Sequence, residues 1–223
     1  PEEKPVRAEV CDDLTINPPQ AYEIDDELAR VAEILTGRRP RSVLLVGPPG
    51  VGKTALVLEL VRQREALGLG RTPVWGTSGA RLVAGMSGFG AWQERCGRLW
   101  REASKERALL HLGNLLELVE VGRSVLNAQG VASFFRPYLV RGDLLAIVEC
   151  TPEQRRIVER KEPQLLEAFV QVELTSPEPA TLRRILARAG EDTQGLSVEE
   201  EALRAIERLH LRYATYSANP GRP

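Results

Sequence analysis

The sequence lacks the features that mark disulfide-rich, zinc-binding and membrane-spanning proteins. Its three cysteines, Cys11, Cys96 and Cys150, are odd in number and widely spaced, which argues against a disulfide framework and against a CxxC zinc site. No apolar run approaches the roughly 20 residues that cross a bilayer, and no signal peptide is visible. We therefore expect a reducing, cytoplasmic setting and no membrane partner.

The sequence also has no marked excess of positive or negative charge. Thirty basic residues stand against thirty-one acidic ones, which leaves a formal net charge of −1. This balance does not indicate a nucleic-acid partner, because surfaces that bind nucleic acids are strongly basic. Lysine is scarce as well and occurs only at positions 4, 53, 105 and 161. The placement of Lys53 is therefore more informative than it would be in a lysine-rich chain.

What is present is the composition of an ordinary globular protein, with 43% hydrophobic and 27% charged residues. A chain of 223 residues can bury a sizeable core, and its length predicts one large domain, alone or with a small appendage. The sequence begins at Pro1 without a methionine and stops at Pro223. We expect it to be a piece of a longer protein.

Short apolar runs alternate with stretches of helical spacing through the first 175 residues. Strands are predicted at residues 42–46, 73–75, 109–112, 144–148 and 169–174. Helices are predicted at 25–35, from 53 to about 67, at 91–105 and at 152–160, the last with Thr151 and Gln154 as a capping box. This alternation predicts an α/β fold with a parallel sheet covered on both faces. After residue 176 only two helices are predicted, at 179–189 and 198–211.

One segment matches the phosphate-loop pattern GxxxxGK[ST] in full, through Gly47, Pro48, Pro49, Gly50, Val51, Gly52, Lys53 and Thr54. Glycines let the backbone approach an anion closely, and the following helix directs the positive end of its dipole at that anion. Lys53 is expected to reach the β- and γ-phosphates, and the Thr54 hydroxyl to ligate Mg²⁺. A chance glycine-rich turn is the alternative. The position of this segment between a predicted strand and a predicted helix disfavours it.

Further segments resemble the first nucleotide-binding domain of the Clp-type AAA+ unfoldases and disaggregases, from about residue 13 to the end of the chain. The resemblance rests on the order and spacing of Leu82-Val-Ala-Gly85, Gln93-Glu-Arg95, Arg141-Gly-Asp-Leu144 and the stretch 209–220 with Arg212-Tyr213. It implies a P-loop AAA+ αβα core with a five-stranded parallel sheet, followed by the start of a small helical lid. It also implies ATP or ADP with Mg²⁺ as ligands, and an adenine pocket lined by the segment 21–24, including Ala21 and Tyr22.

The resemblance suggests a division of the chain into three parts. Residues 1–20, which contain Pro18-Pro19, are expected to form an extended N-terminal arm. Residues 21–175 would form the αβα nucleotide-binding core. Residues 176–223 would form a truncated helical lid.

Several positions depart from the family pattern. The family's second ATP motif is an apolar strand that ends in Asp-Glu, whereas the strand here ends in Gly113-Asn114, neither of which can act as a base. The arginine pair that would reach a neighbouring subunit's site is replaced by Glu167-Ala168. The sensor threonine falls on Cys150, with Thr151 beside it. These changes predict impaired hydrolysis.

Two residues could take over functions whose usual residues are missing from this sequence. Glu149 ends the predicted sensor strand, where ligands bind in open parallel sheets, and could replace the missing base or help to hold Mg²⁺. A loop or helix-cap carboxylate is the alternative interpretation. Phe89, between Gly88 and Gly90, could grip a polypeptide in a ring pore, although an apolar residue in a surface loop is the plainer alternative. His111 lies in an apolar strand, which is typical of a core histidine rather than a ligand.

The sequence thus predicts an ATP- or ADP-binding AAA+ module of a Clp-like protein that uses nucleotide as a structural or switching ligand. The alternative is an active ATPase that assembles as a homo-oligomeric ring and remodels polypeptide clients. That alternative needs a substitute base, a substitute arginine and an aromatic pore grip.

Overall fold

A central sheet organises the chain in the computed structural model, which describes residues 4–86, 90–123, 129–194, 198–213 and 217–221. Within these residues the sheet has six strands in the order β1-β3-β4-β5-β2-β6. They are β1 (Asp12–Asp13), β2 (Ser42–Val46), β3 (Val74–Gly76), β4 (Leu109–Asn114), β5 (Leu145–Cys150) and β6 (Phe169–Glu173). The strands β2 to β6 pair in parallel, and β1 pairs antiparallel with β3 at the edge. The predicted α/β fold with five parallel strands is confirmed, and β1 is a sixth strand that was not predicted.

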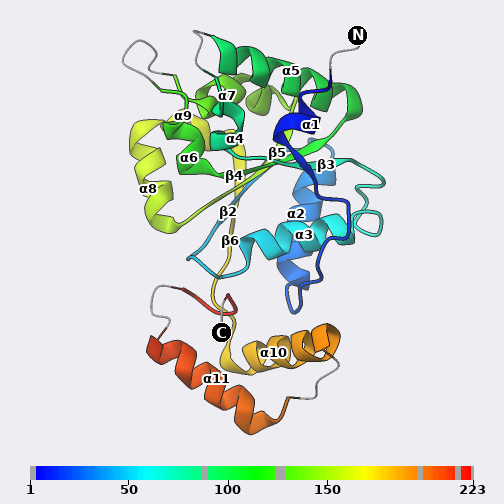
Figure 1. Cartoon of the computed structure of the whole chain (residues 1–223), viewed down its shortest axis with the longest axis vertical. Coiled ribbons are helices and arrows are strands. Elements are labelled where there is room, and N and C mark those ends of the chain that lie inside the picture. Colours follow the sequence, from blue (N-terminus) through cyan, green and yellow to red (C-terminus); the bar gives the residue numbers. More distant parts are fainter. Residues whose placement is uncertain (1–3, 87–89, 124–128, 195–197, 214–216, 222–223) are drawn as a thin grey trace.

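Helices cover both faces of this sheet, because successive strand residues point to opposite sides (Figure 1). On one face α2 (Asp25–Thr36) and α3 (Lys53–Arg62) pack on Val43, Leu45 and Ile147. On the other face Leu44 and Val148 belong to a larger core. That face is covered by α1 (Arg7–Val10), α4 (Gly79–Val83), α5 (Ala91–Glu106), α6 (Leu115–Glu120), α7 (Val131–Arg141), α8 (Pro152–Lys161) and α9 (Pro163–Leu166).

Residues 4–20 include a short helix, although their polar composition predicts an extended arm. Val6 and Val10 lie one helical turn apart and are 2% and 3% exposed, so α1 packs into the larger core. The Glu102 carboxylate accepts hydrogen bonds from the backbone N–H groups of Val6 and Arg7, and Thr77 Oγ1 donates one to the Val10 carbonyl. The pattern of α1 is too short to stand out in a sequence, and its stability comes from these long-range contacts.

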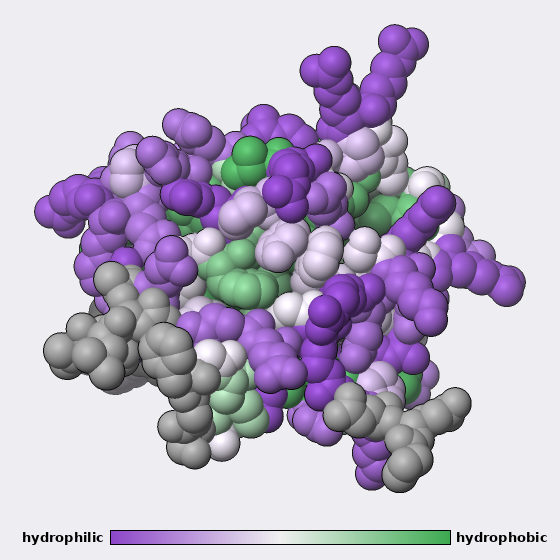
Figure 2. All heavy atoms as spheres, turned by 90° about the horizontal axis from the view of Figure 1, so that it is seen from above, coloured by the Kyte–Doolittle hydropathy of each residue, from purple (hydrophilic) through white to green (hydrophobic). Residues whose placement is uncertain are grey.

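The helix α7 was not predicted, since Pro137 lies inside it and proline normally interrupts a helix. Aromatic packing against α5 supports it. Phe134 meets Trp92 edge-on with ring centroids 6.2 Å apart, and Tyr138 stacks on Trp100 at 4.3 Å. Seen from above, where α5 and α7 lie in Figure 1, the surface is mostly hydrophilic around a small, more hydrophobic central area (Figure 2).

Predicted helix boundaries agree with the structure where local signals are strong. The capping box of α8 is present, with Gln154 N donating to Thr151 Oγ1 and Thr151 N donating to Gln154 Oε1. The helix α3 ends at Arg62, earlier than the predicted residue 67. A turn follows and closes at Gly68 (φ 83°), with Leu69 N donating to the Arg64 carbonyl. This is the hydrogen-bond pattern of a glycine-terminated helix end.

Two helices, α10 (Pro179–Gln194) and α11 (Glu200–Tyr213), lie apart from the sheet at the bottom of Figure 1. Arg183 on α10 joins them through ion pairs with Glu200 at 3.3 Å and Glu207 at 3.1 Å on α11. Both helices were predicted, with α10 extending five residues further and α11 beginning two residues later than expected. In the described part of the chain, none of the helices is both long and apolar enough to cross a bilayer.

A buried carboxylate ties α3 to the segment that precedes α2. Glu59 is 2% exposed and accepts hydrogen bonds from the backbone N–H of Ala21 at 2.9 Å, from Arg62 at 2.6 Å and from Gln63 at 2.5 Å. Burial by itself would raise the pKa of Glu59, but these hydrogen bonds outweigh it and lower the pKa.

We expect Glu59→Gln to lower the free energy of unfolding at pH 7 by about 2 kcal/mol, because near-isosteric replacement removes the charge that Arg62 and Gln63 contact. The pKa of Glu59 is lowered in the folded protein. The stabilisation by its carboxylate is therefore complete above the ordinary glutamate pKa of about 4.3, and it is lost as the pH falls through the pKa of Glu59 in the folded protein. Urea unfolding of both proteins from pH 7 downward tests this. The exposed Glu65→Gln is the control, with an expected change within about 0.5 kcal/mol. Equal stability of Glu59→Gln and the parent protein at pH 7 would contradict the assignment.

Candidate functional site

The predicted phosphate loop connects the end of β2 to the start of α3. Gly50 (φ 84°) and Gly52 (φ 98°) both adopt the left-handed backbone region that glycine tolerates. The backbone N–H of Gly47 donates to the carbonyl of Cys150 at 3.1 Å, which fixes the loop to the end of β5. The loop therefore stands at the carboxyl edge of the sheet, where open α/β folds bind ligands.

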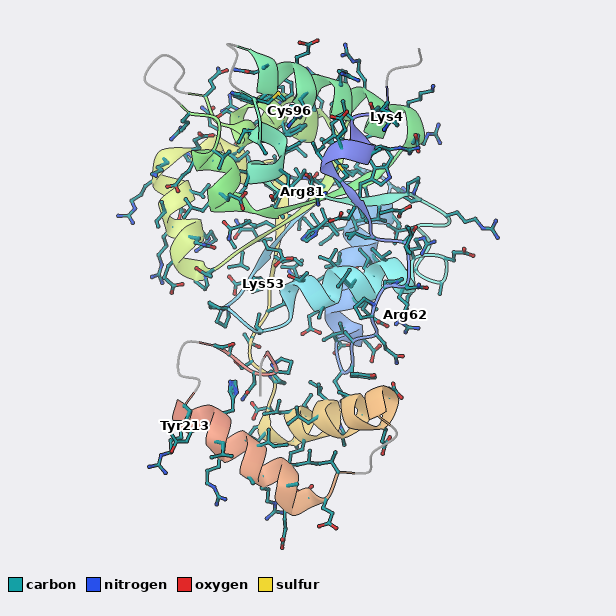
Figure 3. The ribbon with its side chains drawn as sticks, in the orientation of Figure 1. Lys4, Lys53, Arg62, Arg81, Cys96 and Tyr213 are labelled. Atoms are coloured by element: carbon teal, nitrogen blue, oxygen red, sulfur yellow. The ribbon has the colours of Figure 1, made fainter. Side chains whose placement is uncertain are left out.

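Lys53 is the first residue of α3 and lies beside the loop (Figure 3). Its ammonium group donates to the carbonyls of Gly47 at 2.8 Å and Pro48 at 2.9 Å. Burial lowers the pKa of Lys53, and the nearby carboxylate of Glu149 opposes this shift. A lysine ammonium and the N-terminal end of a helix thus meet at one place, which is the arrangement of a phosphate site.

Glu149 lies beside the same loop and contacts two other candidate residues. The Thr54 hydroxyl donates to its carboxylate, at 3.0 Å from Oε1 and 3.1 Å from Oε2. His111 Nε2 lies 2.8 Å from Glu149 Oε1, and the two side chains are only 13% and 12% exposed. The structure therefore brings together Glu149 and Thr54, the two residues for which the sequence suggests a link to Mg²⁺. It also adds His111, for which the apolar strand pattern favours a core role.

The end of β4 carries no carboxylate where the family pattern has Asp-Glu. A register shift between His111 and Asn114 interrupts the pairing with β5. Asn114 is engaged elsewhere, since its Oδ1 accepts the Glu117 backbone N–H at 3.1 Å and its Nδ2 donates to Gln154 at 2.9 Å. The acids that follow in α6 are also engaged, Glu117 with the Ala80 backbone N–H and Glu120 with Lys161.

A cavity of about 520 Å³ adjoins the phosphate loop. Ala21 and Tyr22 line it, as expected of the predicted adenine pocket, together with Val51 of the loop. The sequence did not identify its other walls, among them Ile185 of α10 and Pro220. No local motif marks these positions, because they reach the cavity only when the C-terminal segments fold back on the core.

Side-chain contacts join the wall of this cavity to α10. The Tyr22 hydroxyl donates to Asp192 Oδ2 at 2.6 Å. Glu23 accepts from Arg184 at 2.9 Å and lies 3.3 Å from Arg188. The hydrogen bond from Arg184 holds the pKa of Glu23 below its ordinary value. The segment 21–24 therefore contacts α3 through Glu59 and α10 through these polar pairs.

The last described segment, residues 217–221, lies directly on the phosphate loop. Ala218 N donates to the Pro49 carbonyl at 2.6 Å, and Gly221 N donates to the Gly50 carbonyl at 2.8 Å. A Cβ atom on Gly50 would lie 2.1 Å from Ser217 Oγ and 2.6 Å from the Ala218 carbonyl oxygen. Gly50 is thus required both for its backbone conformation and for this close approach.

Other positions of the family pattern carry no catalytic group in the structure. Ala168 is a buried apolar residue and Glu167 carries a carboxylate, so neither side chain can replace an arginine. Burial raises the pKa of the Cys150 thiol to about 11, which keeps it protonated. Phe89, the candidate pore residue, lies outside the described residues.

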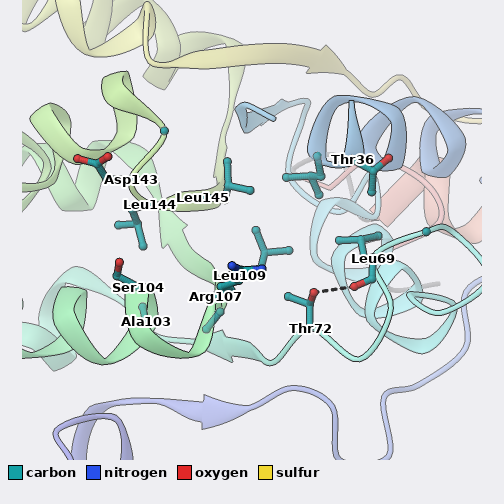
Figure 4. A pocket seen from close by; sticks show the side chains of 14 residues that line it. Thr36, Leu69, Thr72, Ala103, Ser104, Arg107, Leu109, Asp143, Leu144 and Leu145 are labelled. Carbon is teal, nitrogen blue, oxygen red and sulfur yellow. Dashed lines mark hydrogen bonds between the residues drawn. The ribbon is translucent and has the colours of Figure 1, made fainter. Parts of the chain in front are cut away.

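A second cavity of about 490 Å³ lies at the opposite edge of the sheet, at the amino ends of β4 and β5 (Figure 4). Its polar side chains are those of Thr36, Thr72, Ser104, Arg107 and Asp143. None of the predicted site residues lines it. The candidate site is therefore at the loop edge.

Oxygen donors beside the loop fit a divalent cation. The Thr54 hydroxyl and the Glu149 carboxylate are ligand types that Mg²⁺ accepts. Within the described ranges, no group of three or more His, Cys, Asp or Glu side chains could hold a metal ion. A cation at this place would therefore depend on oxygen atoms of a bound phosphate.

Comparisons with known proteins identify relatives of this chain. A scan against protein-family models finds no match. The chain is 32% identical over 200 residues to the chaperone protein ClpB 2 of Parasynechococcus marenigrum, which covers 85% of this chain and 22% of that protein. It is 30% identical over 198 residues to the chaperone protein ClpB of Bacillus cereus, covering 85% of this chain and 23% of the relative.

Among solved structures, the Hsp104:casein complex of S. cerevisiae in its extended conformation matches with a TM-score of 0.80, 21% identity and coverage of 96% of this chain and 38% of that one. The S. cerevisiae Hsp104-ADP complex matches with a TM-score of 0.78 at 22% identity, covering 96% of this chain and 39% of that one. The chain thus spans about a fifth to a quarter of the length of the ClpB relatives. At the level of this domain, the chain belongs to the Clp-type AAA+ family.

Proposed function

We propose that this chain is a nucleotide-holding AAA+ module, impaired in hydrolysis, that uses ATP or ADP with a divalent cation as a structural or switching ligand. The proposal rests on the contrast between the phosphate loop and the end of β4. The phosphate loop, with Lys53 and Thr54, is complete and opens into a cavity of about 520 Å³. The end of β4 holds Gly113 and an Asn114 whose side chain is engaged elsewhere.

Nucleotide binding would use the loop for the phosphates and the cavity for the base. Lys53 and the backbone N–H groups of residues 50–54 would hold the phosphate oxygens. Thr54, with Glu149 beside it, would hold Mg²⁺. Ala21 and Tyr22 would contact the adenine. A volume of about 520 Å³ lies within the range usual for small-molecule sites.

Impaired hydrolysis follows from the groups that are missing around this site. A water molecule attacking the γ-phosphate needs a base or a positioning group, and the end of β4 supplies neither. A trans arginine is worth about 10³ to 10⁵ in rate where it is used, and Glu167-Ala168 cannot provide it. Nucleotide would therefore remain bound much longer than in an active motor.

The switching role rests on the contacts between the loop, the cavity and the C-terminal helices. Residues 217–221 contact Pro49 and Gly50 of the loop, while Glu23 joins the cavity wall to Arg184 of α10. A bound nucleotide would touch both regions and would favour one arrangement of α10 and α11 over others. The division into a core over 21–175 and a lid over 176–223 remains part of this proposal, as does a cytoplasmic location.

An active ring-forming ATPase is the second candidate, and the position of Glu149 favours it. Its carboxylate lies 3.0 Å from Thr54 Oγ1, next to the phosphate loop, where it could take over the role of the lost base. A polypeptide client is suggested by the Hsp104:casein complex, with Phe89 as the candidate pore residue. This alternative still lacks a substitute for the trans arginine.

We expect Lys53→Ala to weaken ATP and ADP binding about 10- to 100-fold, because a charge-assisted hydrogen bond contributes about 1.5–3 kcal/mol. Calorimetric titration with each nucleotide and Mg²⁺ measures the dissociation constants. The matched control is Lys161→Ala, since Lys161 pairs with Glu120 at the surface. Unchanged affinity in Lys53→Ala would rule out the phosphate loop as the nucleotide site.

Steady-state phosphate release distinguishes the two candidate functions. We expect release by the parent protein to be no faster than release by Lys53→Ala. If Glu149 were a working base, release would exceed that background, and Glu149→Gln would reduce it by about 10²- to 10⁴-fold. Release well above background would contradict impaired hydrolysis, and its insensitivity to Glu149→Gln would exclude Glu149 as the base.

A further inference from the structure

The contact between His111 and Glu149 is not needed for the proposed binding of phosphate and adenine. Three side chains from three elements converge beside the phosphate loop: His111 from β4, Glu149 from β5 and Thr54 from α3. His111 Nε2 lies 2.8 Å from Glu149 Oε1, and Thr54 Oγ1 lies 3.0 Å from the same oxygen. An imidazole nitrogen and a hydroxyl oxygen thus both contact the same carboxylate oxygen beside the loop.

These separations match those between neighbouring ligands of one metal ion. An octahedral cation with bonds of about 2.0–2.1 Å places adjacent ligand atoms about 2.9 Å apart. Imidazole nitrogen binds such ions at a similar bond length of about 2.0–2.1 Å. The contacts of Nε2 and of Oγ1 with Glu149 Oε1 therefore have the lengths expected between adjacent ligands of one cation.

We infer that the cation bound together with nucleotide in this chain is ligated by His111 Nε2 as well as by Glu149 and Thr54, and that the site favours Mn²⁺ or Co²⁺ over Mg²⁺. This inference rests on the proposed nucleotide site and specifies its cation. It assigns to His111 a ligand role that the sequence pattern alone did not favour.

The preference follows from the chemistry of the ligands. Mg²⁺ is a hard ion that takes oxygen ligands and retains several waters, whereas imidazole suits first-row transition ions. Affinity of a mixed nitrogen and oxygen site rises from Mn²⁺ to Co²⁺ along the usual order for these ions. A site without the histidine would keep only oxygen ligands and would lose this discrimination.

Metal ions bind an imidazole nitrogen that carries no proton, so His111 would present an unprotonated Nε2 to the cation. The Lys53 ammonium, which also lies near Glu149, would remain available to the phosphates.

The cation would also depend on nucleotide. Across the described parts of the chain, no cluster of three or more His, Cys, Asp or Glu side chains could hold a metal ion. His111 and Glu149 supply two such ligands, Thr54 adds a weak neutral one, and phosphate oxygens would complete the coordination. Mn²⁺ and ADP should therefore each strengthen the binding of the other.

The direct test is pulsed electron paramagnetic resonance of Mn²⁺ bound to the protein with ADP. We expect a coupling from one ¹⁴N nucleus, which changes to the ¹⁵N pattern when the histidines are ¹⁵N-labelled. The coupling should vanish in His111→Gln and persist in His210→Gln, the variant of the chain's only other histidine. Because the isotope exchange needs no substitution, the test holds even if a variant folds poorly.

A second experiment measures the preference for Mn²⁺ over Mg²⁺ through the affinity of ADP. We expect ADP to bind about tenfold more tightly with Mn²⁺ than with Mg²⁺, and this ratio to fall at least several-fold in His111→Gln. Mn²⁺ bound with ADP but without nitrogen coupling, together with a ratio unchanged in His111→Gln, would overturn the inference and leave the nucleotide site intact. If ADP fails to bind with either cation, the proposed function itself is wrong, and this assignment falls with it.

Discussion

The parallel pairing of β2 with β5 is the constraint on which the candidate site depends. Leu45 pairs with Glu149 and Val46 with Cys150, so both strands end at the same edge of the sheet. The hydrogen bond from Gly47 N to the Cys150 carbonyl continues this pairing into the phosphate loop. A carboxylate at position 149 is consequently delivered to the first turn of α3, within reach of Thr54. Displacement of β5 by one residue would turn that side chain to the other face of the sheet.

From that constraint follows a separation between holding a nucleotide and consuming it. Phosphate binding needs the loop, Lys53 and the start of α3, all of which are local to the β2–α3 connection. In the family pattern, hydrolysis also needs groups from the strand that corresponds to β4 and from a neighbouring subunit, and here these positions carry Gly113-Asn114 and Glu167-Ala168. The first set of groups is complete and the second is not. Under the proposed function, the module would report the presence of nucleotide through the contacts of α10 and residues 217–221.

The parts that the sequence predicted well are those encoded by neighbouring residues. The phosphate loop, the capping box of α8 and the five parallel strands each depend on a few adjacent side chains, so a pattern suffices. What the sequence could not predict depends on distant partners. The short helix α1 relies on Glu102 and Thr77, and α7 tolerates Pro137 within aromatic packing on α5. The contact of His111 with Glu149 requires both strand order and the register shift at the end of β4, neither of which is visible in a single strand's pattern.

A nucleotide-holding module retains bound ATP, whereas a motor hydrolyses it. A single-turnover experiment separates these outcomes: ATP is bound to an excess of the protein with divalent cation, and the nucleotide is extracted after increasing times and separated by chromatography. If this chain holds its nucleotide as proposed, the extracted nucleotide remains ATP over many hours. Conversion of bound ATP to ADP within minutes, abolished by Lys53→Ala, would contradict the proposed function.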